Sequence, residues 1–145
     1  MAHFAETIVT SKPAERVFAL LADPENDPSW SSASAETRKT SPGPVGVGSR
    51  FEQAGRFLRL RLPLSLEVTD YEPNRRFGMK GGLGPIEFQG VRELEAVPEG
   101  TRVTFTGGGR AAGPLRIAEP FLSWAGRRQL RRDLARLRDV LEGSD

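Results

Sequence analysis

Arg92 is the polar residue whose position most strongly suggests chemistry. It has the alternating spacing of Ile86, Phe88 and Leu94, so it shares their inward face unless a bulge at Gly90 turns it toward solvent. A buried guanidinium must be paired. Its partner is either a carboxylate, phenolate or enolate of a ligand, or an acidic side chain of the protein itself.

The other candidate groups give weaker signals. Gln53 has the spacing of Phe51, and Asp27 is close enough to Trp30 to lie at the mouth of a pocket. The single histidine, His3, stands at the start of the first expected strand, where general acid–base catalysis is not expected. Because the chain has no cysteine and no Ser/His/Asp set or metal cluster can be assembled, we expect no metal site and no cofactor.

The glutamates and the glycine-rich stretches of the expected strands do not suggest a catalytic or phosphate-binding site. The following glutamates fall on expected solvent-facing sides: Glu6, Glu52, Glu67 and Glu87. The stretches 81–84 and 107–109 are rich in glycine, but they lack the strand-to-helix context and the Lys-Ser/Thr of a phosphate loop. We therefore interpret both stretches as turns.

The elements that must position these residues follow from hydrophobic periodicity. Residues 3–10 predict a strand, and an apolar stripe within 14–21 predicts a helix that ends at Asp23-Pro24. A short helical turn is expected over 25–30. From about residue 34 to 109 the period changes to two, with glycine and proline between segments, which predicts a run of antiparallel strands.

Two longer segments carry internal signals. The clearest strand is 58–68, and Pro63 within it predicts an edge, a bulge or a bend. The chain closes with a helical pattern from about 115 to 142, whose second half has a leucine stripe. Pro120 and Gly126 predict a bend or a change of packing partner in its first half.

The last quarter of the chain is rich in arginine. The residues are Arg127, Arg128, Arg131, Arg132, Arg136 and Arg138. One interpretation is a solvated helix face, partly neutralised by Asp133, Asp139 and Glu142. The other is a surface for an acidic protein, RNA or an anionic membrane. Because aromatic residues do not interleave with the arginines, no specific nucleic-acid recognition is expected.

Length and composition indicate one domain, residues 1–145. No stretch approaches the roughly 18 apolar residues of a membrane span, and the first 25 residues lack the basic and apolar regions of a signal peptide. A cytoplasmic protein is therefore expected. The sequence leaves a monomer or a homodimer open.

Three groups of segments carry a resemblance to a known family. They are residues 14–25 with Trp30, residues 47–51 with 68–77, and residues 93–105 with 133–137. Their order and spacing resemble the START-like (SRPBCC) superfamily, particularly its polyketide cyclase/dehydrase-like branch. The resemblance implies an α+β helix-grip fold, in which a curved antiparallel sheet of about seven strands wraps around a long C-terminal helix, with two short helices after the first strand. Members bind lipids, sterols, polyketides, hormones or quinones in an internal cavity, and a minority catalyse reactions.

The candidate ligand-binding residues combine inward spacing with this implied cavity. They are Trp30, Phe51, Gln53, Leu60, Leu62, Leu64, Phe77, Met79, Phe88, Arg92, Phe105, Phe121 and Trp124. Each of them taken alone also fits ordinary core packing. The set indicates a mostly apolar pocket with a few polar groups that orient a ligand.

Three functions therefore compete. The first is binding or carriage of a small hydrophobic molecule such as a lipid, polyketide or quinone-like compound. The second is a cyclase or dehydratase in which Arg92 stabilises an enolate. The third is an interaction module that uses the arginine-rich helix. The sequence does not identify the ligand or the pathway.

Overall fold

The computed structural model describes residues 2–32, 34–57, 60–83, 86–111 and 119–143. The elements follow in this order: β1 (Ala2–Thr10), α1 (Ala14–Leu21), η1 (Pro24–Ser29), β2 (Ser34–Lys39), β3 (Arg50–Phe57), β4 (Leu60–Glu72), β5 (Arg76–Leu83), β6 (Ile86–Val97), β7 (Gly100–Ala111) and α2 (Glu119–Glu142).

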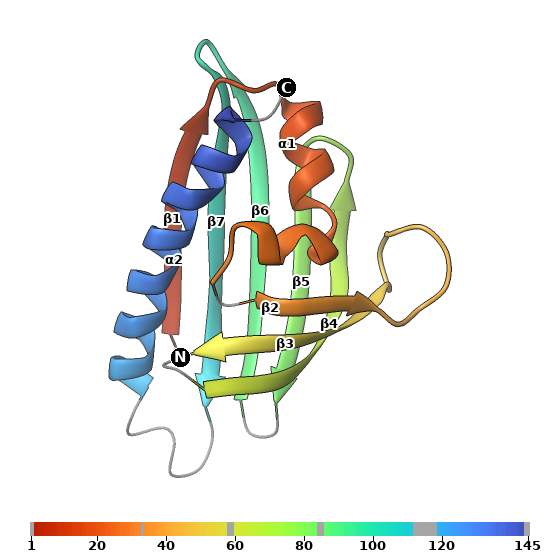
Figure 1. Cartoon of the computed structure of the whole chain (residues 1–145), viewed down its shortest axis with the longest axis vertical. Coiled ribbons are helices and arrows are strands. Elements are labelled where there is room, and N and C mark those ends of the chain that lie inside the picture. The colour runs from red at the N-terminus through yellow and green to blue at the C-terminus, as the bar shows by residue number, and fades with distance from the viewer. Residues whose placement is uncertain (1, 33, 58–59, 84–85, 112–118, 144–145) are drawn as a thin grey trace.

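The strands form one antiparallel sheet of seven strands in the order β1-β7-β6-β5-β4-β3-β2. Consecutive strands from β2 to β7 are neighbours, and β1 pairs with β7, so the first and last strands lie side by side. The sheet curves, with α2 running along β1, α1 packed on β6 and β7, and η1 beside β2 (Figure 1). The predicted α+β helix-grip fold is confirmed.

The two short helices form as the sequence predicts. Val17, Phe18 and Leu21 of α1 are buried against the sheet. The side chain of Asp23 accepts a hydrogen bond of 3.0 Å from the backbone N–H of Glu25, which caps η1 at its N-terminus. The buried stripe holds α1 against the sheet, and the Asp23 cap begins η1, which leads into β2.

The long strand β4 bends after Pro63. Pro63 pairs with Ala54 of β3, but it precedes Ser65, where the described pairing with β5 begins. A proline has no N–H for a ladder, so it is tolerated at this margin. A register shift between Val68 and Asp70 adds a bulge farther along the strand, and bulges increase the local bend of a sheet.

The helix α2 buries the expected leucine stripe. Leu134, Leu137 and Leu141 are buried, and Leu130 is partly buried against the same core. The helix runs continuously through Gly126. A bend or a change of packing partner in its first half stays a prediction. Pro120 lies in the first turn, where no backbone hydrogen bond is lost. The expected start of the helix at residues 115–118 lies outside the described residues.

The C-terminal end of α2 is tied to the turn after β1. Glu142 accepts hydrogen bonds from the Thr10 hydroxyl at 2.9 Å and the Ser11 backbone N–H at 2.8 Å, and also from the Ser11 hydroxyl. The hydrogen bonds from Ser11 and Thr10 lower the pKa of Glu142 to about 2. This contact fixes the second half of α2 over the sheet.

The described glycines of these stretches, at 81, 82 and 107–109, lie within strands, so their interpretation as turns is wrong, while Gly84 lies outside the described residues. Gly81 lies in β5, and Gly107 and Gly109 lie in β7. A Cβ on Gly107 would lie 2.8 Å from Cζ of Phe4, and one on Gly81 would lie 2.7 Å from Cδ2 of Leu66. The glycines therefore allow side chains of neighbouring strands to lie flat against the sheet.

Candidate ligand-binding site

A cavity of about 500 Å³ lies between the inner face of the sheet, η1 and the first half of α2. Its wall is mostly apolar and includes Phe4, Leu62, Met79, Phe88 and Leu130. Binding sites for small molecules have volumes of roughly 300–1,000 Å³ and the same mainly apolar character. The cavity therefore has the size and lining of a site for a small molecule.

Gly90 helps to explain why the inner face of the sheet leaves this space empty. Gly90 of β6 pairs with Gly107 of β7 on one side and with Met79 of β5 on the other, without a bulge. Gly90 lines the cavity, and a Cβ built there would meet no atom closer than the Thr106 carbonyl oxygen at 3.7 Å. The wall at Gly90 is therefore open because a side chain is missing from a regular strand.

Arg92 and Asp27 form a buried ion pair at one end of the cavity. The Arg92 guanidinium donates to both carboxylate oxygens of Asp27, at 3.0 and 2.8 Å, and to the Leu21 carbonyl at 2.8 Å. The exposed side-chain fractions are 12% for Arg92 and 3% for Asp27. Arg92 thus faces inward and is paired by an acidic side chain of the protein, one of the two partners considered from the sequence.

Aromatic rings surround the same guanidinium. The Arg92 Cζ atom lies 5.2 Å from the ring centroid of Trp30, 5.9 Å from that of Phe77 and 5.8 Å from that of Phe105. Cation–π attraction is stronger at desolvated sites such as this one. Burial raises the pKa of Asp27, while the charge of Arg92 opposes that rise. Asp27 is therefore a buried structural partner and does not lie at the pocket mouth.

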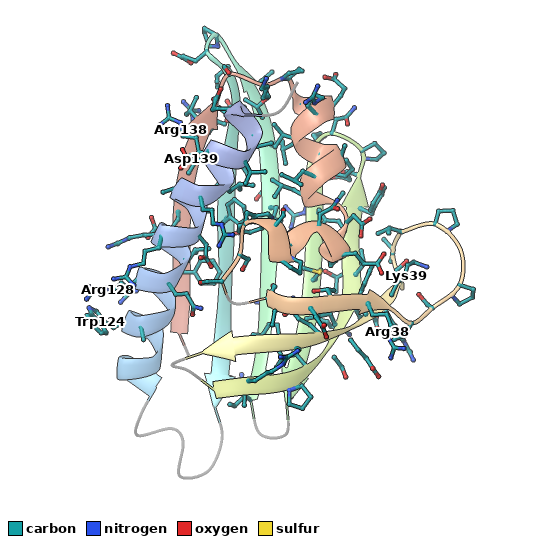
Figure 2. The ribbon with its side chains drawn as sticks, in the orientation of Figure 1. Arg38, Lys39, Trp124, Arg128, Arg138 and Asp139 are labelled. Atoms are coloured by element: carbon teal, nitrogen blue, oxygen red, sulfur yellow. The ribbon has the colours of Figure 1, made fainter. Side chains whose placement is uncertain are left out.

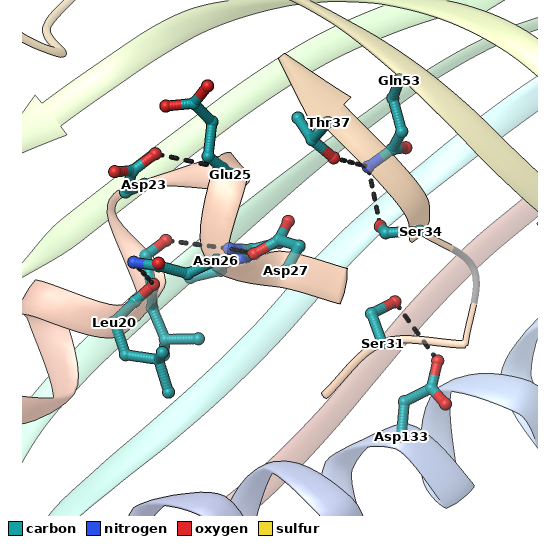
Figure 3. Close-up of polar contacts among 12 residues, drawn as sticks. Leu20, Asp23, Glu25, Asn26, Asp27, Ser31, Ser34, Thr37, Gln53 and Asp133 are labelled. Carbon is teal, nitrogen blue, oxygen red and sulfur yellow. Dashed lines mark hydrogen bonds and ion pairs between the residues drawn. The ribbon is translucent and has the colours of Figure 1, made fainter. Parts of the chain in front are cut away.

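Two more sets of polar side chains lie at the cavity (Figure 3). In the first, Gln53 Nε2 donates to the hydroxyls of Ser34 at 2.7 Å and Thr37 at 3.1 Å. In the second, the Ser31 hydroxyl donates to Oδ2 of Asp133 on α2 at 3.4 Å. Asp133 is buried, with 4% of its surface exposed, and it lines the cavity. A carboxylate in this position can accept a hydrogen bond from a bound molecule.

Sequence reasoning missed Asp133 as a cavity residue. The sequence suggested that it partly neutralises a solvated arginine face. Its spacing from Leu130 and Leu137, three and four residues away, could have placed it on the buried stripe instead.

Trp30 contributes its ring to the wall. Its indole Nε1 is itself buried and has no hydrogen-bond partner among the described residues. A buried donor without a partner is costly, so this group lowers the stability of the site.

Comparison with known proteins identifies the family. The model of the family described as "Polyketide cyclase / dehydrase and lipid transport" matches residues 1–142. The chain belongs to this family. An uncharacterized protein of Mycobacterium tuberculosis is 30% identical over 138 residues, which cover 88% of this chain and 80% of that protein.

Solved structures of other proteins share this fold. The ZhuI aromatase/cyclase from Streptomyces sp. R1128 is similar with a TM-score of 0.81, at 16% identity over 97% of this chain and 93% of that chain. Ara h 8.0201 is similar with a TM-score of 0.75, at 10% identity over 98% of both chains. At these identities the two structures are evidence for the fold alone.

Most of the candidate ligand-binding residues lie on or beside the cavity of this family member. Trp30, Gln53, Leu62, Phe77, Met79, Phe88 and Arg92 line it. Phe51 and Phe105 are buried in the core, and Leu64 is half-buried away from the wall. The side chains of Leu60 and Phe121 lie outside the described residues. Contact between any of these residues and a ligand stays a prediction.

Two orientations differ from those predicted. Trp124 was expected to close the cavity, but 53% of its surface is exposed, because it lies on the side of α2 opposite the buried leucines. Glu6 was expected on a solvent-facing side, but it shares the inner face with Phe4 and Ile8 and is half-buried. Its carboxylate accepts a hydrogen bond of 2.8 Å from Arg131.

Neither a metal-binding cluster nor a membrane-spanning helix is found among the described residues. Within the described part of the chain, no group of three or more His, Cys, Asp or Glu residues could hold a metal ion. None of the described helices is both long and apolar enough to cross a bilayer.

Proposed function

We propose that this protein binds a small hydrophobic molecule in the cavity between the sheet and α2. The observation that carries the proposal is the apolar cavity of about 500 Å³, which the missing side chain of Gly90 leaves unfilled. A core without a ligand function gains stability from dense packing, because cavities are destabilising. The family's description also names polyketides and lipids.

The polar groups on the wall narrow the type of ligand. Asp133 supplies an acceptor within a wall that is otherwise mostly apolar. A ligand with an apolar body and a hydroxyl group that can donate to Asp133 would match both features. A lipid, a polyketide and a quinone-like compound with a hydroxyl group all have this character.

Catalysis of the cyclase or dehydratase type is the second candidate. The buried carboxylate of Asp133 on the cavity wall supports it, since a positioned carboxyl group can transfer protons. Arg92 supports it less, because three of its hydrogen bonds already go to Asp27 and Leu21. Stabilisation of an enolate by Arg92 would require breaking that pair, so binding is the function that the geometry favours.

Native mass spectrometry of the freshly purified protein tests the binding proposal. We expect an adduct of one small molecule per chain, which extraction with organic solvent releases for identification. A second measurement follows the fluorescence of an apolar dye added to protein that has been stripped by extraction and refolded. A mass equal to that of the chain, together with no dye binding by the folded protein, would overturn the proposal.

A further inference from the structure

The outer side of α2 carries an exposed tryptophan beside a cluster of arginines. Trp124 is 53% exposed, and the Arg128 Cζ atom lies 5.5 Å from the centroid of its ring. Both side chains point away from the body of the protein in Figure 2. We call Trp124, Arg127, Arg128, Arg131 and Arg132 the α2 outer face.

The charge of this surface is only partly neutralised. All four arginines are exposed, and Arg131 pairs with Glu6 at 2.8 Å. Within the described part of the chain, no salt bridge neutralises Arg127, Arg128 or Arg132. The acidic residue within the same segment, Asp133, points inward and is buried. The α2 outer face is therefore a positively charged surface with one large aromatic ring.

This surface adjoins the cavity. Gly126, Arg127 and Leu130 of α2 line the cavity, and so does Arg110 at the end of β7. Arg110 and Arg127 are also exposed, so the lining of the cavity and the α2 outer face share residues at the molecular surface.

We propose that the α2 outer face docks the protein on an anionic lipid membrane, from which the cavity takes up its ligand. The uptake step rests on the proposed binding function. Basic side chains are attracted to the negative surface potential of such membranes, and tryptophan prefers the interface between lipid and water. A hydrophobic ligand also concentrates in lipid, so a protein docked there would meet its ligand at the membrane surface.

The pattern fits a membrane better than RNA. Proteins that hold single-stranded nucleic acid stack successive bases on several aromatic side chains. The α2 outer face offers one such ring, Trp124, which the Arg128 guanidinium already accompanies. One interfacial ring with surrounding cations is instead typical of a peripheral membrane contact.

Sedimentation with lipid vesicles tests the proposal. Wild-type protein is mixed with vesicles of phosphatidylcholine alone or with phosphatidylglycerol added, at low and high salt. We expect binding to the anionic vesicles that weakens with salt, and roughly 30-fold weaker partitioning for Arg128→Gln/Arg132→Gln. The control Arg75→Gln/Lys80→Gln removes the same charge from exposed positions in the β4–β5 turn and on β5, and it should retain wild-type binding.

The tryptophan provides a second readout. Vesicles with brominated acyl chains should quench the fluorescence of the wild type but not that of Trp124→Phe, whose remaining tryptophan, Trp30, is buried. Absence of vesicle binding, equal losses in the two double variants, or binding to an RNA oligonucleotide without binding to vesicles would overturn the docking proposal. If native mass spectrometry still shows a bound ligand in those cases, the cavity function stands and only the docking surface is wrong.

Discussion

Arg92 of β6 and Asp27 of η1 are 65 positions apart in the chain, yet they meet in a two-point ion pair that is almost fully buried. The same guanidinium bonds to the carbonyl of Leu21 at the end of α1. One side chain thus ties both short helices to the sheet and closes one end of the cavity.

Breaking this pair should strongly destabilise the fold. We expect Arg92→Ala or Asp27→Asn to lower the free energy of unfolding by about 3–5 kcal/mol, because each leaves a buried polar group without its partner. The double variant Asp27→Leu/Arg92→Met should lose less than the sum of the corresponding single variants, which urea denaturation measures. Additive losses would show that the two groups contribute independently.

Substitution of Gly90 should reduce ligand binding according to the size of the new side chain. Gly90→Ala fits the open space, so it should retain the adduct in native mass spectrometry. Gly90→Leu should weaken binding by more than about tenfold, while the cost in unfolding free energy stays within about 1–3 kcal/mol. Unchanged binding by Gly90→Leu would place the ligand elsewhere.

Asp133 should reduce the stability of the ligand-free protein. Burying a carboxyl group costs more than burying an amide of the same shape, so Asp133→Asn should raise the unfolding free energy by about 1 kcal/mol. The exposed Asp139 on the same helix is labelled in Figure 2, and Asp139→Asn serves as the matched control with little expected change. If Asp133→Asn instead destabilises the protein, its contact with Ser31 contributes more than the burial of its carboxyl group costs.

The contact of Glu142 with Ser11 and Thr10 should make stability depend on acid pH. Since the pKa of Glu142 is lowered to about 2 in the folded protein, its contribution is complete above the unfolded value of 4.5 and is lost as the pH falls toward 2. Glu142→Gln should therefore lower the melting temperature at pH 6 more than at pH 2. Glu99→Gln, at the exposed β6–β7 turn, is the control; equal effects of Glu142→Gln at both pH values would contradict this account.

The fold could be predicted from the sequence because its signals are local. The stripe within α1, the leucines of α2 and the Asp23-Pro24 stop each depend on neighbours a few residues away. The site could be predicted less well because it depends on contacts between distant elements. The acidic partner of Arg92 comes from η1, and the glycines of β7 face Phe4 of β1.

Trp124 illustrates the limit of residue type as a guide to position. A tryptophan is often buried, but the choice between the two sides of a helix depends on where the packed stripe lies. Leu134, Leu137 and Leu141 define that stripe in α2, and Trp124 points away from it. Asp133 shows the reverse case, in which a charged residue lies on the buried stripe.

The two halves of α2 are attached to the protein in different ways. The second half has buried leucines and the Glu142 contact, whereas the first half borders a cavity that its own side chains do not fill. Segments with fewer packed contacts open at lower free energy. The amide hydrogens near Leu130 should exchange with solvent faster than those near Leu137, so that transient opening at this end gives a ligand access while the rest of the fold remains closed.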